Sequence, residues 1–497
     1  MKEFLFNLFG NAVFCYSLAL IGSYIIMVLL AGRKIIRQQN YSVDEYDREL
    51  INKSPYTPGV SIIAPAFNEE KTIVANVLSL LDQDYPTFEV VIINDGSKDQ
   101  TLEKMIQYFG LVEVPYAYHE RIHTKPYKRL FKSKLDEYAR LTVVDKENGG
   151  TKADAVNAGL NVARYPYFVN TDVDCILTRD AIFNCIKPVL QKENVIAVSG
   201  AMTMSNGCEV KNGRLMNHRA PKSPIPCFQV LEYLRSYFVG KMAWSAINAM
   251  PNVSGGYGLF NTEIMIAAGG YTSDSLAEDM DMVFRAIRYC CDFNRPYRIE
   301  QIPATCCWTE APSNFTILYR QRTRWGRGLI QTFARHRDMV LNPKYRRLGL
   351  ITTPYLLIFE FLAPLIEFLG FCTFIYLAFT GGVNWLGALV IFLGVYFFGI
   401  MIALVTMSYD YMSGRTFDKR RDYVLVFLAS VFEPFIYHPF LTACSLIGYG
   451  KYLFMTRSTW GKMSRKGYAE GDIPSATNLE DSDENIIPVT AYNTTKS

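Results

Sequence analysis

Charged residues are scarce in this chain of 497 residues: Lys, Arg, Asp and Glu together make up 20% of it. Half of the residues are hydrophobic, and this balance excludes general disorder, because disordered chains combine low hydrophobicity with high net charge. The net charge is only +4, without the strongly basic footprint typical of nucleic-acid binding. We therefore expect a folded protein with no nucleic-acid partner, and its length excludes a single small domain.

Charge is missing altogether from residues 4–32, and between Arg347 and Asp410 the only charged residues are Glu360 and Glu367. Both runs exceed the roughly 20 apolar residues that a helix needs to cross the hydrocarbon core of a bilayer. The sequence therefore predicts a multi-pass integral membrane protein, located in the cell membrane and in contact with its lipids.

The chain also lacks a cysteine framework. Its 11 cysteines run from Cys15 to Cys444 without any C-x-x-C motif, and their number is odd. That spacing argues against a set of disulfides and against a zinc site. Reduced and mostly buried thiols are the expectation, which places the soluble part of the protein in the cytosol.

The first apolar stretch, residues 5–31, is followed directly by Arg33, Lys34 and Arg37. Cations collect on the cytoplasmic side of membrane segments, so the C-terminal end of this stretch should face the cytosol. A cleaved signal peptide is the alternative, but the stretch is longer than the usual h-region of about 7 to 15 residues, and no A-x-A site precedes the cations. We predict a retained transmembrane anchor over residues 1–37.

Short apolar runs alternate with amphipathic stretches between residues 58 and 312. The runs are residues 60–64, 90–93, 141–144 and 167–169. This alternation is typical of βαβ units, so the region is predicted to be one α/β domain around a largely parallel sheet. A basic insert at residues 119–134 separates the second and third runs, and it is expected to be a solvated loop or a contact with anionic lipid head groups.

Apolar segments dominate the remainder of the chain. Residues 227–250 are apolar but interrupted by charges, which favours a core or interfacial helix over a span. Interfacial helices are expected at residues 313–347 and a membrane region at residues 348–455. The final residues, 456–497, are acidic and without an apolar period, and they are predicted to be mostly disordered.

Inside the membrane region, residues 350–380 and 385–407 are the predicted spans, and the cationic turn that follows belongs inside. The last apolar stretch, residues 423–453, is broken by Glu433-Pro434 and His438-Pro439. It could span, re-enter or lie along the interface, and the cations after it favour a re-entrant or interfacial segment.

Polar clusters follow each of the four predicted strands. They are Pro65-Ala-Phe-Asn68-Glu69, Asn94-Asp95-Gly96-Ser97, Asn148-Gly-Gly-Thr-Lys152 and Thr171-Asp172-Val-Asp174. In open parallel sheets ligands bind beyond the carboxyl ends of the strands. Each cluster alone would also suit a turn or a helix cap, but together they describe the rim of a pocket.

Asp172 and Asp174 are two residues apart at a strand end, which directs both carboxylates to the same side. Such an oxygen-only pair suits a hard divalent cation that keeps other positions for water and phosphate oxygens, although a capped turn is the plainer alternative. Asp95 could accept hydrogen bonds from a nucleoside, and Lys152 could counter a phosphate.

Two further clusters lie nearer the membrane region. Glu278 and Asp279 begin an amphipathic helix, where acidic residues are either favoured by the helix dipole or available as a general base. Gln321, Arg324 and Trp325 fall at positions i, i+3 and i+4 and so share one helix face. Most of the other arginines near them are expected to be snorkelling cations at the membrane interface.

Taken in order, these motifs resemble membrane-bound family 2 glycosyltransferases of the processive type, the relatives being poly-β-1,6-N-acetylglucosamine, cellulose, chitin and hyaluronan synthases. The resemblance covers residues 58–340, with a weaker echo at residues 460–466. It implies a cytosolic GT-A domain with a mixed, largely parallel sheet, joined to transmembrane and interfacial helices. It also implies a UDP-sugar donor and a Mg²⁺ or Mn²⁺ ion.

Residue roles follow from the same resemblance. The nucleotide sugar would be held by Pro65, Asn68, Glu69, Asp95, Lys152 and Asp172, and the metal by Asp174 with Asp172. Asp279 of the Glu278-Asp279 pair would be the general base, and Arg324 would face the diphosphate. Gln321 would help to form the site, Trp325 would receive the acceptor sugar, and Ser254 and Gly255 would let the acceptor approach closely.

The predicted activity is inverting transfer of a sugar to a growing β-linked polysaccharide at the cytosolic membrane face. Transfer of a single sugar to a lipid acceptor is the alternative, and a binding or transport protein is a third class. Only three membrane spans are predicted, which is fewer than in synthases that form their own polysaccharide channel. Export of a polymer could therefore require a second copy of the chain or a separate export partner.

Overall fold

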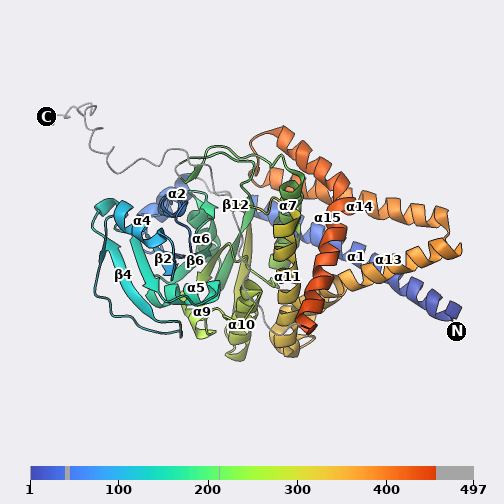
Figure 1. Cartoon of the computed structure of the whole chain (residues 1–497), viewed down its shortest axis with the longest axis horizontal. Helices are drawn as coiled ribbons and strands as arrows, with labels where there is room; N and C mark the ends of the chain where they lie inside the picture. Colours follow the sequence, from blue (N-terminus) through green and yellow to red (C-terminus); the bar gives the residue numbers. More distant parts are fainter. Residues whose placement is uncertain (1, 40–44, 212, 455–497) are drawn as a thin grey trace.

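The computed structural model describes residues 2–39, 45–211 and 213–454. A sheet with its covering helices fills one end of the molecule, and long helices fill the other (Figure 1). The predicted tail at residues 456–497 lies outside the described residues. Ten strands form the main sheet, in the order β3 (Leu111–Glu113), β4 (Tyr127–Ser133), β5 (Leu141–Lys146), β2 (Phe88–Asp95), β1 (Val60–Ala66), β6 (Tyr167–Thr171), β11 (Tyr257–Asn261), β8 (Val195–Met204), β12 (Arg298–Thr309) and β7 (Ile176–Leu177).

The sheet is mixed and largely parallel, as predicted. Strands β5, β2, β1 and β6 run parallel to one another, and β8 and β12 form a second parallel pair. Strand β11 joins the two groups because it is antiparallel to both β6 and β8. The four predicted strands are therefore neighbours, and the polar clusters that follow them meet at one edge of the sheet.

Two hydrophobic cores lie on opposite faces of this sheet, because alternate residues of a strand point to opposite sides. Ile62 packs in one core, and its neighbour Ile63 packs in the other. The first face is covered by α3 (Ile73–Leu81), α4 (Thr101–Tyr108) and α6 (Ala181–Gln191), and the second by α5 (Lys152–Val162), α9 (Thr262–Ala267) and α10 (Glu278–Asp292). Helix α5 lies so close to β1 that a Cβ on Gly159 would be 2.4 Å from Ile63 Cγ2.

The basic insert is only partly a loop, and the prediction of a solvated loop is wrong for residues 127–133. These residues form β4, which pairs antiparallel with β5 and buries Leu130 and Phe131. Lysines and arginines flank the two buried residues, so the sequence pattern did not indicate a strand. Arg129 forms an ion pair with Asp145 at 3.0 Å.

Residues 227–250 are core, which is one of the two alternatives that the sequence favoured over a membrane span. Residues 227–246 fall in α7 (Pro224–Arg235), the π-helical segment η2 (Ser236–Lys241) and α8 (Met242–Ala246), and most side chains of residues 227–250 are buried. Helix α7 lies beside the end of the sheet in Figure 1, between β12 and the long helices. Short elements complete the described chain: α2 (Glu45–Lys53), η1 (Asp136–Tyr138), β9 (Val210–Lys211), β10 (Arg214–Leu215), η3 (Arg337–Met339) and η4 (Pro343–Tyr345).

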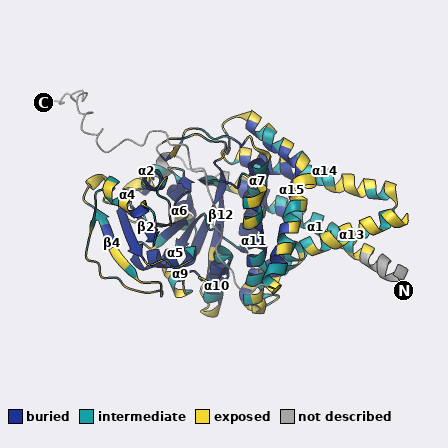
Figure 2. Ribbon diagram, in the orientation of Figure 1, coloured by how far each residue is buried: buried dark blue, intermediate teal, exposed yellow. Residues whose placement is uncertain are grey.

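Four helices within the described residues are long and apolar enough to cross a membrane, which makes this a membrane protein. They are α1 (Lys2–Gln39), residues 348–380, α14 (Trp385–Met412) and α15 (Arg420–Phe454); the second comprises η5 (Leu348–Thr352), α12 (Thr353–Tyr355), η6 (Leu356–Phe361) and α13 (Ala363–Thr380). Figure 2 shows broad exposed surfaces on α13 and α14, as expected for side chains that face lipid.

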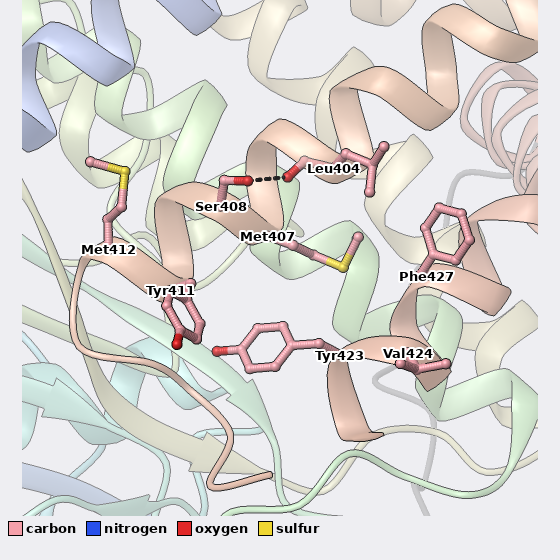
Figure 3. A pocket seen from close by; sticks show the side chains of 8 residues that line it. All are labelled: Leu404, Met407, Ser408, Tyr411, Met412, Tyr423, Val424 and Phe427. Atoms are coloured by element: carbon pink, nitrogen blue, oxygen red, sulfur yellow. Dashed lines mark hydrogen bonds between the residues drawn. The ribbon is translucent and has the colours of Figure 1, made fainter. Parts of the chain in front are cut away.

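Helix α15 differs from the other three. Pro434 and Pro439 lie inside it without ending it, so residues 423–453 form one helix. In Figure 1 its C-terminal half stands at a steep angle to α1, α13 and α14 and lies beside α11 (Phe315–Arg335). The side chains between α14 and α15 leave an apolar groove of about 400 Å³, lined by residues such as Leu404, Tyr411 and Phe427, and none of the predicted site residues belongs to it (Figure 3).

All 11 cysteines lie within the described residues and are free thiols, and eight of them are buried. Cys306 and Cys307 are adjacent on β12 and fully buried. The expected pattern of reduced, mostly buried thiols is therefore met.

A buried carboxylate fastens α10 to the end of α11. Asp281 is almost completely buried; its Oδ1 lies 2.9 Å from His336 Nε2 and accepts a hydrogen bond from Arg335 at 3.3 Å. Burial would raise the pKa of Asp281, but hydrogen bonds from His336 and Thr272 outweigh it and lower the pKa to about 2. The ionised carboxylate therefore stabilises the folded state.

We predict that Asp281→Asn lowers the free energy of unfolding by about 2 to 3 kcal/mol at neutral pH. Since the folded pKa lies below the unfolded value of about 3.9, the wild-type advantage is complete above about pH 5 and is lost as the pH falls through 4 towards 2. Thermal unfolding of the detergent-solubilised protein across this range measures it.

The matched control is Asp274→Asn, which removes the exposed partner of the same arginine, Arg335. Exposed ion pairs contribute under about 1 kcal/mol, so this variant should unfold close to the wild type. Equal losses in the two variants would contradict a special role for the buried carboxylate.

Candidate active site

The loop after β1 is tied to the loop after β2. Asn68 has a left-handed backbone (φ 57°), its amide donates to Ser97 Oγ, and its side-chain oxygen accepts from the Lys98 amide at 2.8 Å. The Glu69 amide donates to Thr101 Oγ1. With Pro65, which is half-buried near the end of β1, these residues form the first wall of the predicted pocket.

Asp95 ends β2 and is held by a buried cation. Its Oδ1 accepts from Lys146 Nζ at 2.8 Å and from the Gly149 amide at 2.9 Å. Lys146 is fully buried and also pairs with Asp154 at 2.6 Å, in the first turn of α5. The sequence interpretation missed Lys146; a lysine that closes an apolar strand is the signal that could have found it.

Lys152 starts α5 and reaches two other elements. Its Nζ lies 2.5 Å from Asp172 Oδ1, at the end of β6, and 2.6 Å from the carbonyl oxygen of Gly255, before β11. Burial opposes the charge, but Asp172, Glu278 and the hydrogen bond to Asp172 outweigh it, so the pKa of Lys152 is raised. The amine remains a cation beside the carboxylates.

Asp172 and Asp174 converge, together with Cys175. One possible ligand atom from each lies within 4.8 Å of the others. The two carboxylates suit a hard cation such as Mg²⁺ or Mn²⁺, which prefers oxygen ligands and retains positions for water or phosphate. Cys175 packs in the core, where its thiol behaves as a small apolar group.

Gly255 links this cluster to a second pair of carboxylates. Its carbonyl accepts from Lys152, and its amide donates to Asp279 Oδ2 at 3.2 Å. Glu278 and Asp279 are the first residues of α10. Ser254 is half-buried beside them, with its Oγ 3.0 Å from the sulfur of Met202.

Glu278 lies between opposing charges. Burial and the neighbouring Asp279 raise its pKa, and Arg324 and Lys152 oppose that rise. Arg324 comes from α11, which packs so closely on the start of α10 that a Cβ on Gly328 would lie 2.9 Å from the Cβ of Ala277. The structure thus brings Lys152, the adjacent Glu278 and Asp279, and Arg324 together from three places in the sequence.

The other two members of the predicted helix face are also on α11. Gln321 is half-buried, and Trp325 is 38% exposed. The prediction that the neighbouring arginines snorkel at the interface is wrong for Arg322, which is buried and pairs with Glu232 of α7 at 2.6 Å. A glutamate inside the apolar stretch 227–250 was the available signal for that partner.

Lys241 is a second cation that the sequence interpretation did not single out. It is buried on η2, with its Nζ 4.5 Å from the ring centroid of Tyr237. Burial lowers the pKa of Lys241 to about 8, and the negative charge of Asp279 opposes the shift. Lys241 is therefore near enough to Asp279 for the two opposite charges to interact.

A mixed α/β sheet with carboxylates gathered at its strand ends, continuous with long apolar helices, defines a membrane-associated glycosyltransferase with a GT-A-like catalytic domain. The chain belongs to glycosyltransferase family 2: the family model "Glycosyl transferase family 2" matches residues 61–121 and 126–260, and the model "Glycosyl transferase family group 2" matches residues 228–407.

Similar proteins include two polysaccharide synthases. The poly-β-1,6-N-acetyl-D-glucosamine synthase of Staphylococcus epidermidis is 24% identical over 442 residues, which cover 88% of this chain and 92% of that protein. The synthase of the same name from Staphylococcus aureus is 26% identical over 318 residues, 63% of this chain and 64% of that protein. A solved mannosyltransferase from Pyrobaculum calidifontis, in complex with GDP-Man and Mn²⁺, has a TM-score of 0.47 at 20% identity, covering 87% of this chain and 99% of that one.

The turn after Asp95 yields a prediction, because Gly96 has φ +65° and a Cβ there would lie 2.8 Å from the backbone nitrogen of Asn148. Gly96→Ala therefore meets backbone that cannot move aside, and it should lower the free energy of unfolding by about 1 to 3 kcal/mol. Denaturant unfolding of the purified protein measures the loss.

Gly150→Ala is the matched control, since Gly150 also has a left-handed backbone (φ +73°) but has no atom within 4 Å of a built Cβ. It should cost only the backbone strain, about 1 kcal/mol. A loss at Gly150 as large as that at Gly96 would show that the contact with Asn148 is unimportant.

Proposed function

We propose that this protein transfers a sugar from a UDP-sugar to a growing β-linked polysaccharide, with inversion, at the cytosolic face of the membrane. The observation that carries the proposal is the position of Gly255. Its carbonyl binds the lysine of the donor side, and its amide binds the carboxylate of the acceptor side. Both halves of a transfer site are thereby held by one residue.

On the donor side, Pro65, Asn68, Glu69 and Asp95 hold the nucleotide at the ends of β1 and β2. Lys152 counters the negative diphosphate, and Asp172 and Asp174 hold Mg²⁺ or Mn²⁺. When bound, the ion neutralises charge that develops as UDP leaves. The support for this set is the convergence of the two carboxylates beside Lys152, whose amine lies 2.5 Å from Asp172 Oδ1.

On the acceptor side, Asp279 takes the proton from the acceptor hydroxyl as that oxygen attacks the anomeric carbon. The bond from this carbon to the diphosphate oxygen breaks, and the electron pair leaves with UDP. Attack from the opposite face converts an α-linked donor into a β-linked product. Arg324 faces the departing diphosphate beside Glu278, and Gln321 completes the wall of the site.

Trp325 offers an apolar ring to the acceptor sugar, and Ser254 and Gly255 give the acceptor room to approach. Both synthases named above make poly-β-1,6-N-acetyl-D-glucosamine, and the longer alignment includes the catalytic domain as well as membrane helices. UDP-N-acetylglucosamine is therefore the donor that we propose.

We also propose a topology with the catalytic domain in the cytosol. Arg33, Lys34 and Arg37 end the first span, and Lys419, Arg420 and Arg421 follow α14, so both basic clusters belong inside. Helix α15 then lies along the cytosolic interface, because its C-terminal half crosses the direction of the other membrane helices (Figure 1). This arrangement keeps both ends of α15 inside.

Replacing the proposed base tests the mechanism. Asp279→Asn should lower the turnover number by about 10²- to 10⁴-fold and leave the dissociation constant for UDP within twofold of the wild type. UDP release from membranes supplied with UDP-N-acetylglucosamine gives the first quantity, and calorimetry gives the second. Asp292→Asn, at the opposite end of the same helix, is the control; unchanged turnover in Asp279→Asn would reject this base.

Removing divalent ions tests the donor side. EDTA should abolish UDP release by the wild type, Mg²⁺ or Mn²⁺ should restore it, and Asp174→Asn should raise the metal concentration needed by at least tenfold. Mass spectrometry of the product then gives its length. A polymer supports the proposal, whereas a single sugar on a lipid would favour the non-processive alternative.

A further inference from the structure

Arg322 lies between Gln321 and Trp325 in the sequence, but it points into the protein and is not on the face that Gln321, Arg324 and Trp325 share. Only 5% of it is exposed. Its two terminal nitrogens donate to both carboxylate oxygens of Glu232, at 2.6 and 2.7 Å. This paired geometry is specific to arginine and fixes the plane of the guanidinium.

Tyr437 of α15 closes the contact. Its hydroxyl donates to Glu232 Oε2 at 2.6 Å and accepts from Arg322 at 3.0 Å. The ring is fully buried and stacks on Phe228, with the ring centroids 5.3 Å apart. Three helices, α7, α11 and α15, therefore meet at one hydrogen-bonded group.

The guanidinium of Arg322 also lies over the ring of Trp325, 4.1 Å from its centroid. A cation at this distance from an indole face is attracted by the ring's electrons. One face of Trp325 is thus covered, while the residue as a whole remains 38% exposed. The orientation of the exposed ring depends on where the guanidinium plane is held.

Close backbone packing makes this support rigid. A Cβ on Gly448 of α15 would lie 2.7 Å from the carbonyl oxygen of Thr323, and one on Gly326 would lie 3.2 Å from Ser445. A second ion pair, Arg235 with Glu433 at 2.6 Å, also joins α7 and α15, and neither of its residues is on α11. The Arg235–Glu433 pair therefore resembles the Arg322–Glu232 pair in chemistry and can serve as its control.

We propose that Glu232, Arg322 and Tyr437 are positioning residues, which hold the Trp325 ring in the orientation that binds the acceptor sugar. The inference rests on the proposed function for the identity of the acceptor. It goes beyond that function because it assigns part of acceptor binding to a helix of the membrane region. Donor binding, which uses the strand ends, should not depend on this network.

Tyr437→Phe is the decisive variant, because it removes one hydroxyl and preserves the ring. With a soluble β-1,6-linked N-acetylglucosamine pentamer as acceptor, its KM for the pentamer should rise about threefold to tenfold. The KM for UDP-N-acetylglucosamine and the slow UDP release without acceptor should stay within twofold. Glu433→Gln is the control and should leave all three within twofold.

A double-mutant cycle separates positioning from general damage. In a Trp325→Ala background, Tyr437→Phe should have no further effect on the KM for the pentamer, since the residue it positions is gone. An equal rise in both backgrounds, or a parallel rise in the donor KM, would overturn the proposal.

Fluorine NMR of protein labelled with 5-fluorotryptophan tests the same link without any turnover. The chain has five tryptophans, so Trp325→Phe assigns the resonance. Tyr437→Phe should shift or broaden the Trp325 signal and leave the other four unchanged; an unmoved signal would overturn the proposal. If the wild type releases no UDP with any acceptor, the proposed function fails, and this spectrum still decides whether the network holds Trp325.

Discussion

Four carboxylates gather at one edge of the sheet, and their repulsion must be offset for the site to exist. Asp172 and Asp174 come from the end of a strand, and Glu278 and Asp279 from the start of a helix. A buried carboxylate without a counter-charge takes up a proton instead of staying ionised. Lys152 belongs to the sheet domain, but Arg324 comes from α11, so the site is complete only where α11 packs against α10.

Helix α11 is in turn supported by α15, which packs against it, and this contact divides the surface of α15 into two faces. Its buried residues include Val426, Ser430, Glu433, Tyr437 and Cys444, spaced three to seven residues apart along one face. Large apolar residues such as Leu428 and Phe432 are exposed on the remainder of the helix. One face of α15 therefore packs against the protein, and the other is exposed and apolar.

Local patterns predicted most of the catalytic domain. The apolar composition of residues 60–64 and 90–93 predicts strands there. The polar residues that follow these runs predict the edge of the sheet where ligands bind. Strand β4 was missed because its exposed positions are basic, and Lys146 and Arg322 were missed because their partners are distant in the sequence. The direction of α15 depends on packing with α7 and α11, which no local pattern encodes.

The tight contact between α11 and α15 can form only late in the synthesis of the chain. Residues 60–309 can complete the sheet as soon as they leave the ribosome, but Gly326 meets its partner only after Ser445 has been made. During that interval α11 can already contact α7 and α10, but it lacks its contact with α15. The packing of α11 is therefore complete only once the last helix of the membrane region has been translated.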